Sequence, residues 1–365
     1  MPRSPTSITP PLSGVVQPVR IGFIPLADCA PLLVAKEQDL FRKHGVRVEL
    51  SSEVGWATIR EKLLYRQIDA AHAIAGLAIA MRLGLSTPPC PVVAPFVFNL
   101  HGNAITLSRD LWNRGVRDAA TMKKLIRSST SRRFTFAMVS RYASHFFLLR
   151  RWLMEGGINP DQDVRLVALP PTQMPANLAA GLIDGYCVGE PWNSIAVEKG
   201  HGWIVATSEQ LAPNHPEKVL LMHEGFVDHH RDQALAITEA LREACAFCDA
   251  PDNRAEVVRI LAGSGYFNGS ERALRRSLIG PLDLGTGKSM EAATFHIFHR
   301  REANLPHSER GLWLLNEFIT HGLIAPARRA EATEALAACW STDCLHPPAA
   351  AKTATKSKKT ATSAA

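Results

Sequence analysis

The sequence predicts an α/β protein with two lobes, each a mainly parallel sheet flanked by helices, arranged as a clamshell. Two observations support this prediction. From residue 19 to residue 98, short apolar segments with strand character alternate with segments of helical periodicity. The same alternation begins again at residue 134 and continues to residue 206, which predicts a second sheet.

In the first alternating region, runs of apolar and β-branched residues mark the strands, and apolar residues spaced three or four positions apart mark the helices. Gly45 and Gly84 are natural helix ends. We expect strands at residues 19–24, 46–50, 70–73 and 91–98. We expect helices at residues 30–44, 58–66 and 77–83.

The second region repeats these patterns. Gly156 and Gly157 end one predicted helix, and Pro191 suits the first position of another. We expect strands at residues 134–139, 164–168, 185–188 and 203–206. We expect helices at residues 145–155, 174–180 and 191–199. A helix-rich part should follow over residues 233–324.

This order of elements predicts two lobes joined by two crossovers. In such folds ligands bind at the carboxyl ends of the strands, in the crevice between the lobes. The end of the chain is rich in Ala, Thr, Lys and Ser and too poor in apolar residues to fold. We expect disordered ends at 1–18 and 346–365, a first lobe at 19–104 and 208–345, and a second lobe at 105–207.

The composition argues against nucleic-acid binding and against a disulfide framework. The net charge is +7, but four of the lysines lie in the segment after residue 346, so the folded part is only mildly basic. The seven cysteines are an odd, scattered set, which is typical of a reducing compartment. The absence of any run of 18 or more apolar residues argues against a membrane span.

One cysteine pair has metal-ligand spacing. Cys245 and Cys248 form a Cys-x-x-Cys motif inside a predicted helix, and no second pair stands at the spacing of a zinc site. A metal site remains the alternative, but we interpret these residues as buried structural thiols and predict no metal site and no cofactor.

The first residues do not have the pattern of an export signal. Residues 1–18 are polar and proline-rich, whereas a secretory signal needs an apolar stretch of about 7–15 residues. The segment Leu26-Ala27-Asp28-Cys29 has only a superficial likeness to a lipoprotein cleavage box, because Asp28 replaces a small residue. We therefore expect a cytoplasmic protein.

Several polar side chains stand where predicted strands end or lobes cross over: Trp56, His72, Asn103, His145 and Lys218. Indole, imidazole, amide and ammonium donors outnumber acids among them, which favours a small anion over a cation. A planar anion such as nitrate needs several modest donors and one counter-charge. Each residue also has an ordinary structural interpretation as a packing or surface group. The segment Glu190-Pro191-Trp192 could simply begin a helix.

At these residues the chain resembles the nitrate-binding proteins of the NrtA/CmpA type, within the type II solute-binding superfamily. The most specific match is the block Cys187-Val188-Gly189-Glu190-Pro191-Trp192-Asn193. The resemblance covers about residues 20–321, and its other matching segments are 22–32, 55–60, 71–72, 170–174 and 215–218. It implies a clamshell of the type II periplasmic-binding-protein kind.

The resemblance also implies a set of site residues. Trp56, His145 and Lys218 would line an anion site. Asn103, in the stretch 100–104, stands where the nitrate transporters have a glutamine, so its amide is one methylene shorter. Lys218 favours nitrate or nitrite over bicarbonate. The supporting residues would be His72, Gly102 and Glu190.

Together with the expected cytoplasmic location, the resemblance is strongest to the nitrate/nitrite sensors of the NasS type. In the family these sensors hold an ANTAR-type RNA-binding antiterminator, a response-regulator-like protein, and release it when nitrate or nitrite binds. We therefore expect a sensor that controls nitrate assimilation genes through transcription antitermination. It would contact neither nucleic acid nor membrane directly.

Three other interpretations stay open at this point. The chain could be the extracytoplasmic substrate-binding component of an anion-import ABC transporter, or a scaffold, although a scaffold would leave the donor-rich loops unexplained. It could also be an enzyme with His145 and Glu190 as an acid/base pair. Related enzymes that make the thiamine pyrimidine depend on a cysteine-rich motif that this chain lacks, and the sequence has no nucleophile elbow and no glycine-rich phosphate loop. We expect no enzyme activity and no catalytic residues.

Overall fold

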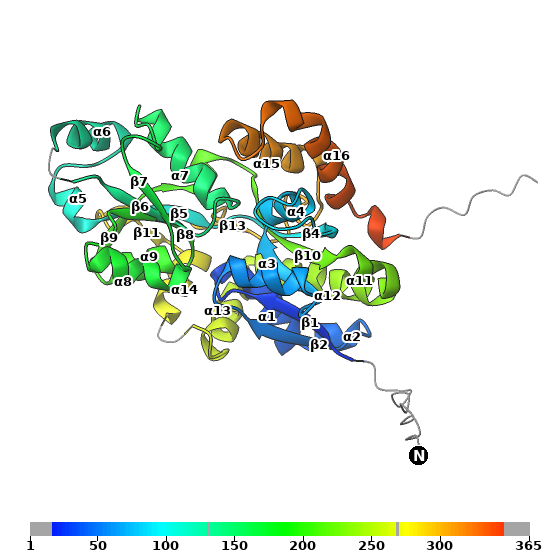
Figure 1. Cartoon of the computed structure of the whole chain (residues 1–365). Helices are drawn as coiled ribbons and strands as arrows, with labels where there is room; N and C mark the ends of the chain where they lie inside the picture. The colour runs from blue at the N-terminus through cyan, green and yellow to red at the C-terminus, as the bar shows by residue number, and fades with distance from the viewer. Residues whose placement is uncertain (1–16, 130–131, 268–269, 347–365) are drawn as a thin grey trace, which may run out of the picture.

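The computed structural model describes residues 17–129, 132–267 and 270–346. The predicted disordered ends, 1–18 and 346–365, lie outside the described residues except at Gln17, Pro18 and His346. Two sheets with helices on both faces form the two lobes (Figure 1). The α/β clamshell that the sequence predicts is therefore confirmed.

The first sheet has six strands in the order β13-β4-β10-β3-β1-β2. Strands β1, β2 and β3 are mutually parallel, while β10 pairs antiparallel with both β3 and β4. The bounds are β1 (Val19–Phe23), β2 (Val48–Ser52), β3 (Ala70–Ile74), β4 (Val92–His101), β10 (Pro216–His223) and β13 (His296–Ile297).

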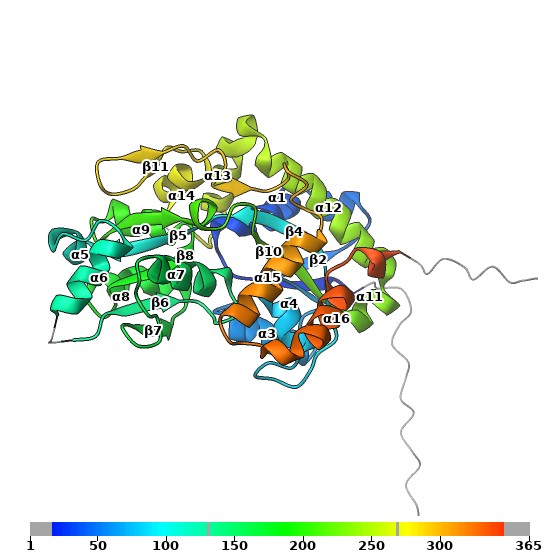
Figure 2. The same ribbon diagram turned by 90° about the horizontal axis from the view of Figure 1, so that it is seen from above.

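Two layers of helices cover this sheet, one on each face, as the view from above shows (Figure 2). One layer holds α1 (Ala30–Glu37), α2 (Leu40–Lys43), α12 (Arg231–Asp249), α13 (Arg254–Gly263) and α14 (Glu271–Leu278). The other layer holds α3 (Trp56–Leu64), α4 (Gly76–Arg82), α15 (Ser308–Thr320) and α16 (Arg329–Cys339). None of the helices in the described ranges is both long enough and apolar enough to cross a membrane.

The second sheet has five strands in the order β7-β6-β8-β5-β9. Strands β6, β7 and β8 are parallel, and β5 is antiparallel to both of its neighbours. The strands are β5 (Asn103–Ser108), β6 (Thr135–Met138), β7 (Arg165–Ala168), β8 (Gly185–Gly189) and β9 (Gly202–Thr207). The larger helices around it are α6 (Ala119–Ser128), α7 (Ser144–Glu155), α8 (Met174–Ala179) and α9 (Trp192–Glu198).

Short elements complete the fold. A hairpin of β11 and β12 lies beside β9, where the Ile204 amide donates to the carbonyl oxygen of Leu284 at 2.9 Å. The remaining bounds are α5 (Arg109–Asn113), α10 (Ser208–Leu211), α11 (Glu224–His229), β11 (Leu282–Asp283) and β12 (Ser289–Met290).

The elements differ from the sequence predictions in several ways. The helix predicted over 30–44 is broken, because Asp39 adopts a left-handed backbone with φ 59° between α1 and α2. Strands β5 and β10 are absent from the prediction, which treated these segments as crossovers. Helices α5, α6, α10 and α11 and the short strands β11, β12 and β13 are absent from it as well. The other predicted strands and helices are present with bounds that differ by a few residues at most.

The chain crosses between the sheets twice. The first crossing is at Gly102, between β4 and β5, with φ 95°. A Cβ atom there would collide with the ring of His296, so this turn needs both the conformation and the small size of glycine. The second crossing lies between α10 and β10, and it returns the chain to the middle of the first sheet.

The two lobes also touch away from the crossovers. The Ala27 amide donates to the carbonyl oxygen of Glu190 at 2.7 Å. Gly76, at the start of α4, faces the backbone carbonyl of Tyr142 in the second lobe, and the Tyr142 ring stacks on Phe318 of α15. These contacts hold the two sheets close together.

Replacing Gly76 with alanine should force the lobes apart. The added Cβ would overlap the carbonyl oxygen of Tyr142, and such overpacking costs about 1–3 kcal/mol of unfolding free energy. We expect Gly76→Ala to lower stability in urea unfolding and to raise the radius of gyration in small-angle X-ray scattering. Gly263→Ala is the control, because a Cβ there meets nothing within 4 Å. Equal behaviour of the two variants would contradict the lobe contact.

Candidate functional site

A buried lysine lies where the two lobes meet. Lys218 on β10 donates from its Nζ to Asp28 Oδ2 at 2.7 Å and to Glu217 Oε1 at 2.6 Å. All three side chains are almost completely buried. Burial of a charge is tolerated only when it is paired and hydrogen-bonded, and here two carboxylates satisfy one ammonium.

The local backbone explains how neighbouring residues on one strand reach the same group. Successive strand residues normally point to opposite faces. The pairing of β10 with β4 shifts register between Pro216 and Lys218 and again between Lys218 and Val219. This irregularity lets the Glu217 and Lys218 side chains converge. Asp28 comes from the short 3-10 turn Ala27–Cys29 that follows β1.

Residues from both lobes surround Glu217. Asn103 at the start of β5 donates from Nδ2 to Glu217 Oε2 at 2.6 Å, and the Ser144 hydroxyl at the start of α7 donates to the same oxygen. His145 Nε2 lies 3.6 Å from Glu217 Oε1, and His215 Nε2 lies 3.5 Å from Glu217 Oε2. One carboxylate therefore joins side chains of both lobes.

Two aromatic side chains of the first lobe complete the cluster. Trp56 is the first residue of α3, and the centroid of its ring lies 5.5 Å from Lys218 Nζ. His72 on β3 places its Nε2 3.2 Å from the Asp28 carbonyl oxygen and 3.4 Å from Asp28 Oδ1. Both residues are buried.

Several buried polar atoms of the cluster have no hydrogen-bond partner among the described residues. Buried polar groups are nearly always paired in proteins, so their concentration at one place marks where a ligand would be held. These atoms are Asp28 Oδ1, Trp56 Nε1, His72 Nδ1, Asn103 Oδ1, both ring nitrogens of His145, and His215 Nε2. Two of them are oxygens, and the rest are ring nitrogens.

The electrostatics of the cluster are unlike those predicted from sequence. Donor groups still outnumber acids, but the two carboxylates of Asp28 and Glu217, which were not expected at the site, exceed the single ammonium of Lys218. Burial alone would raise the pKa of Glu217, but Lys218 and His145 lower it well below its usual range. Burial lowers the pKa of His145 to about 4, so this imidazole is neutral at pH 7.

The pKa values of the other two charged groups also reflect burial. Burial raises the pKa of Asp28, although Lys218 opposes this effect. Burial would lower the pKa of Lys218, but the neighbouring Asp28 and Glu217 carboxylates raise it. Lys218 is therefore a charged ammonium throughout the neutral range.

The structure brings together most of the side chains predicted from sequence. Trp56, His72, Asn103, His145 and Lys218 form one cluster. Four residues were not assigned from sequence: Asp28, Ser144, His215 and Glu217. Asp28, His215 and Glu217 stand inside segments that were quoted for the resemblance, but nothing in a single sequence shows that Asp28 and Glu217 both reach Lys218.

Gly102 and Glu190, the other two predicted supporting residues, have structural roles. Gly102 forms the first crossover. Glu190 turns its carboxylate toward α9, where Oε2 accepts from the Ser194 amide at 3.0 Å. Pro191 is the N-cap of that helix, not its first residue as predicted. The acid/base pair of His145 with Glu190 is also wrong, because the carboxylate beside His145 belongs to Glu217.

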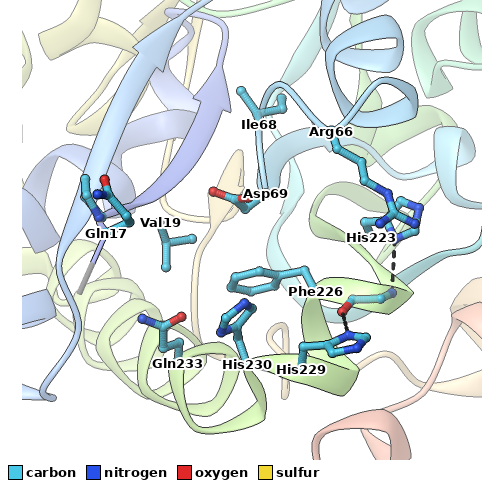
Figure 3. A pocket seen from close by; sticks show the side chains of 12 residues that line it. Gln17, Val19, Arg66, Ile68, Asp69, His223, Phe226, His229, His230 and Gln233 are labelled. Atoms are coloured by element: carbon cyan, nitrogen blue, oxygen red, sulfur yellow. Dashed lines mark hydrogen bonds between the residues drawn. The ribbon is translucent and has the colours of Figure 1, made fainter. Parts of the chain in front are cut away.

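A separate cavity of about 740 Å³ lies in the first lobe, at the ends of β1 and β10 that are farther from the Lys218 cluster (Figure 3). It opens beside the start of β1 and the end of β10, and none of the predicted site residues lines it. Its lining combines Val19, Ile68 and Phe226 with Arg66 and His223. The Lys218 cluster is at the other end of β10.

The cysteines and potential metal ligands give no second site. Cys245 and Cys248 are buried on α12, and Cys245 Sγ donates to the Phe98 carbonyl oxygen at 3.5 Å. Throughout the described ranges, no three His, Cys, Asp or Glu side chains are placed to hold a metal ion.

Comparison with known proteins identifies the family. The NMT1-like family matches residues 14–262. The nitrate/nitrite binding protein NrtA of Nostoc sp. strain PCC 7120 is 31% identical over 318 residues, which cover 84% of this chain and 71% of that protein. The chain belongs to the NMT1-like family of NrtA/CmpA-like solute-binding proteins. The resemblance stated from sequence is therefore confirmed at the level of the family.

Two other relatives are longer proteins. In Synechocystis sp. strain PCC 6803, the nitrate import ATP-binding protein NrtC is 39% identical over 307 residues and the bicarbonate transport ATP-binding protein CmpC is 36% identical over 306 residues. Each alignment covers 83% of this chain. The chain spans about half the length of these two relatives, 46% in each case.

A solved structure shares the fold closely. The periplasmic nitrate-binding protein NrtA from Synechocystis PCC 6803 superposes with a TM-score of 0.85 at 28% identity, covering 90% of this chain and 87% of that one. The NrtA relatives are nitrate-binding solute-binding proteins and not enzymes, which agrees with the expectation of no enzyme activity.

The buried Glu190 carboxyl should make stability depend on pH. Burial raises the pKa of Glu190 to about 7 from 4.5. Between these two pKa values the folded protein keeps the proton while the unfolded chain loses it. The contribution of Glu190 to the free energy of unfolding is therefore fully present below about pH 4.5 and is lost as the pH rises through 7. Glu190→Gln keeps an oxygen that can accept from the Ser194 amide, and it should remove this loss of stability because glutamine does not ionise.

We expect Glu190→Gln to be more stable than the wild type above pH 7, by up to about 3 kcal/mol. The difference should disappear near pH 4.5. Urea unfolding of both proteins between pH 4.5 and 8.5 measures it. A difference that is constant across this range would contradict a protonated Glu190.

Proposed function

We propose that this protein binds nitrate or nitrite between its two lobes, with Trp56, Asn103, His145 and Lys218 lining the site. The observation behind the proposal is the group of unpartnered buried polar atoms around Lys218. The names of the NrtA relatives, which are nitrate/nitrite binding proteins, support the same ligand.

The chemistry of the cluster suits a planar monovalent anion. Nitrate spreads one charge over three oxygens, so it is held by several donors and one counter-charge. Trp56 would donate its indole N–H and His145 an imidazole N–H, and neither group has a hydrogen-bond partner in the described part of the chain. Lys218 supplies the positive charge. Because these residues come from both lobes, a bound anion favours the closed arrangement.

We further propose that the protein is a cytoplasmic sensor rather than a transport component. It would hold an ANTAR-type antiterminator and release it when the anion binds, and so control nitrate assimilation genes. All seven cysteines are free thiols, six of them buried, which is typical of proteins from reducing compartments. The sensor itself would contact neither RNA nor membrane.

Linkage explains how such a sensor works. If the anion favours closed lobes and the antiterminator prefers open ones, the anion weakens the partner and the partner weakens the anion by the same factor. The second candidate function is the substrate-binding component of a nitrate ABC transporter. The import and transport names of NrtC and CmpC favour it.

Nitrate should bind the purified protein with one-to-one stoichiometry in calorimetry and raise its melting temperature through linkage. Trp56→Phe keeps the ring beside Lys218 and removes only the indole N–H. A hydrogen bond to a charged group contributes about 1.5–3 kcal/mol, so the affinity should fall about ten- to a hundredfold. Trp56 is a sharper probe than Lys218, because removing the ammonium would leave Asp28 and Glu217 buried without a counter-charge.

Trp203→Phe is the matched control. Its indole nitrogen is also buried without a partner, but it packs against Trp112 in the core of the second lobe. Its nitrate affinity should equal that of the wild type. Nitrite and bicarbonate titrations complete the test. Wild-type nitrate affinity in Trp56→Phe, or binding of bicarbonate alone, would contradict the assignment.

The sensor proposal predicts a complex that nitrate dissociates. We expect the tagged protein to copurify with a response-regulator-like RNA-binding protein from cells grown without nitrate, and to lose it when millimolar nitrate is added. Trp56→Phe should keep the partner at nitrate concentrations that release it from the wild type. Copurification with a membrane permease and an ATPase, unaffected by nitrate, would support the transporter instead.

A further inference from the structure

The Glu217 carboxylate has the surroundings of a bound anion. Its Oε1 accepts from Lys218 Nζ at 2.6 Å, and its Oε2 accepts from Asn103 Nδ2 at 2.6 Å and from the Ser144 hydroxyl. The imidazoles of His145 and His215 approach the two oxygens at 3.6 and 3.5 Å. Five side chains, drawn from both lobes, thus face one carboxylate.

These donors overlap with those proposed for nitrate. A carboxylate resembles nitrate in being planar, monovalent and delocalised over oxygens. Asn103 has two amide protons, and both are already donated, to Glu217 and to Ser144 Oγ at 3.2 Å. Lys218 has three protons, of which Asp28 and Glu217 accept two. Donors that serve Glu217 are not free to serve a second anion.

We propose that Glu217 is a tethered competitor that occupies the anion position, and that a free anion binds only when this carboxylate gives up its donors and the cluster takes up a proton. This inference rests on the proposed nitrate binding. Under this proposal Glu217 lowers the affinity for the anion, and the anion binds more tightly as the pH falls.

The charges in the cluster require the proton. Asp28 and Glu217 already exceed the single charge of Lys218, and all three groups are buried. With Asp28 and Glu217 both ionised, an added nitrate would raise the excess to two negative charges among buried side chains, which is strongly unfavourable. A proton on Asp28, whose pKa burial raises, on Glu217 once it has given up its donors, or on a neighbouring imidazole removes one of them.

Side chains that could accept the proton come from several helices and strands around Glu217. Burial lowers the pKa of His145 to about 4, so its ring is neutral before the anion arrives and gains basicity from an added negative charge. The titratable groups that interact electrostatically with Glu217 are Lys218 and the adjoining His215, His145 on α7, Asp28 after β1, His72 on β3, His101 on β4 and Cys187 on β8.

Glu217→Gln tests the proposal with little change in shape. The amide keeps an acceptor oxygen but removes the competing charge, so nitrate affinity at pH 7.5 should rise at least about tenfold. Calorimetry of nitrate binding in buffers of different ionisation enthalpy counts the protons taken up. We expect about one proton per anion in the wild type and close to none in Glu217→Gln.

Asp28→Asn is the matched control. It removes the other carboxylate from Lys218, but Asp28 makes no hydrogen bond to Asn103 or Ser144, so the gain in affinity should be smaller. Equal gains in both variants would show a general charge effect and overturn the competitor assignment. Weaker or unchanged binding in Glu217→Gln would also overturn it.

The number of protons taken up by the wild type can be measured even if the variants fail to fold. Nitrate binding by the wild type without proton uptake would overturn this inference and leave the proposed function intact. A wild-type protein that binds no nitrate would overturn the proposed function itself, and this inference with it.

Discussion

The ammonium of Lys218 is held between two carboxylates at the junction of the lobes, and much of the structure serves that arrangement. Asp28 reaches it from the turn after β1, and Glu217 reaches it because the register of β10 shifts beside β4. Glu217 in turn ties Asn103 and Ser144 of the second lobe to the first. Each of these charges would be costly to bury alone. The cluster therefore couples the relative position of the lobes to the occupancy and protonation of a few side chains.

The same coupling explains why a binding protein can also act as a regulator. Closure brings donors of both lobes around one small ligand, and any surface that differs between open and closed forms can read that event. The family relatives include binding and transport proteins with one shared fold. What distinguishes a sensor from a transport component is then the partner that recognises the closed or open surface, and not the ligand cluster.

Much of the fold could be predicted from sequence because its strands and helices have clear periodicity. The failures have physical causes. Asp39 breaks a helix through a left-handed backbone that apolar spacing does not reveal. Strand β10 begins with a proline and two charged residues, which are typical of a loop, yet those charges are buried. Local pattern and resemblance together indicated Trp56 and Lys218. Glu217 was missed as a site residue because neighbours on a strand normally face opposite ways, and a register shift is a property of the folded pair of strands.

The place of β10 in the first sheet has a consequence for biosynthesis. This strand lies between β3 and β4, although the whole second sheet separates it from them in the sequence. The second lobe is contiguous in sequence, so its five strands can pair as soon as they leave the ribosome. Strands β3 and β4 of the first sheet cannot complete their pairing until β10, which lies between them, has been synthesised. Non-local pairing of this kind is slow and leaves strand edges exposed. The Lys218 cluster is thus completed only after the second sheet and β10 have been synthesised, so a nascent chain that ends before β10 lacks both Glu217 and Lys218.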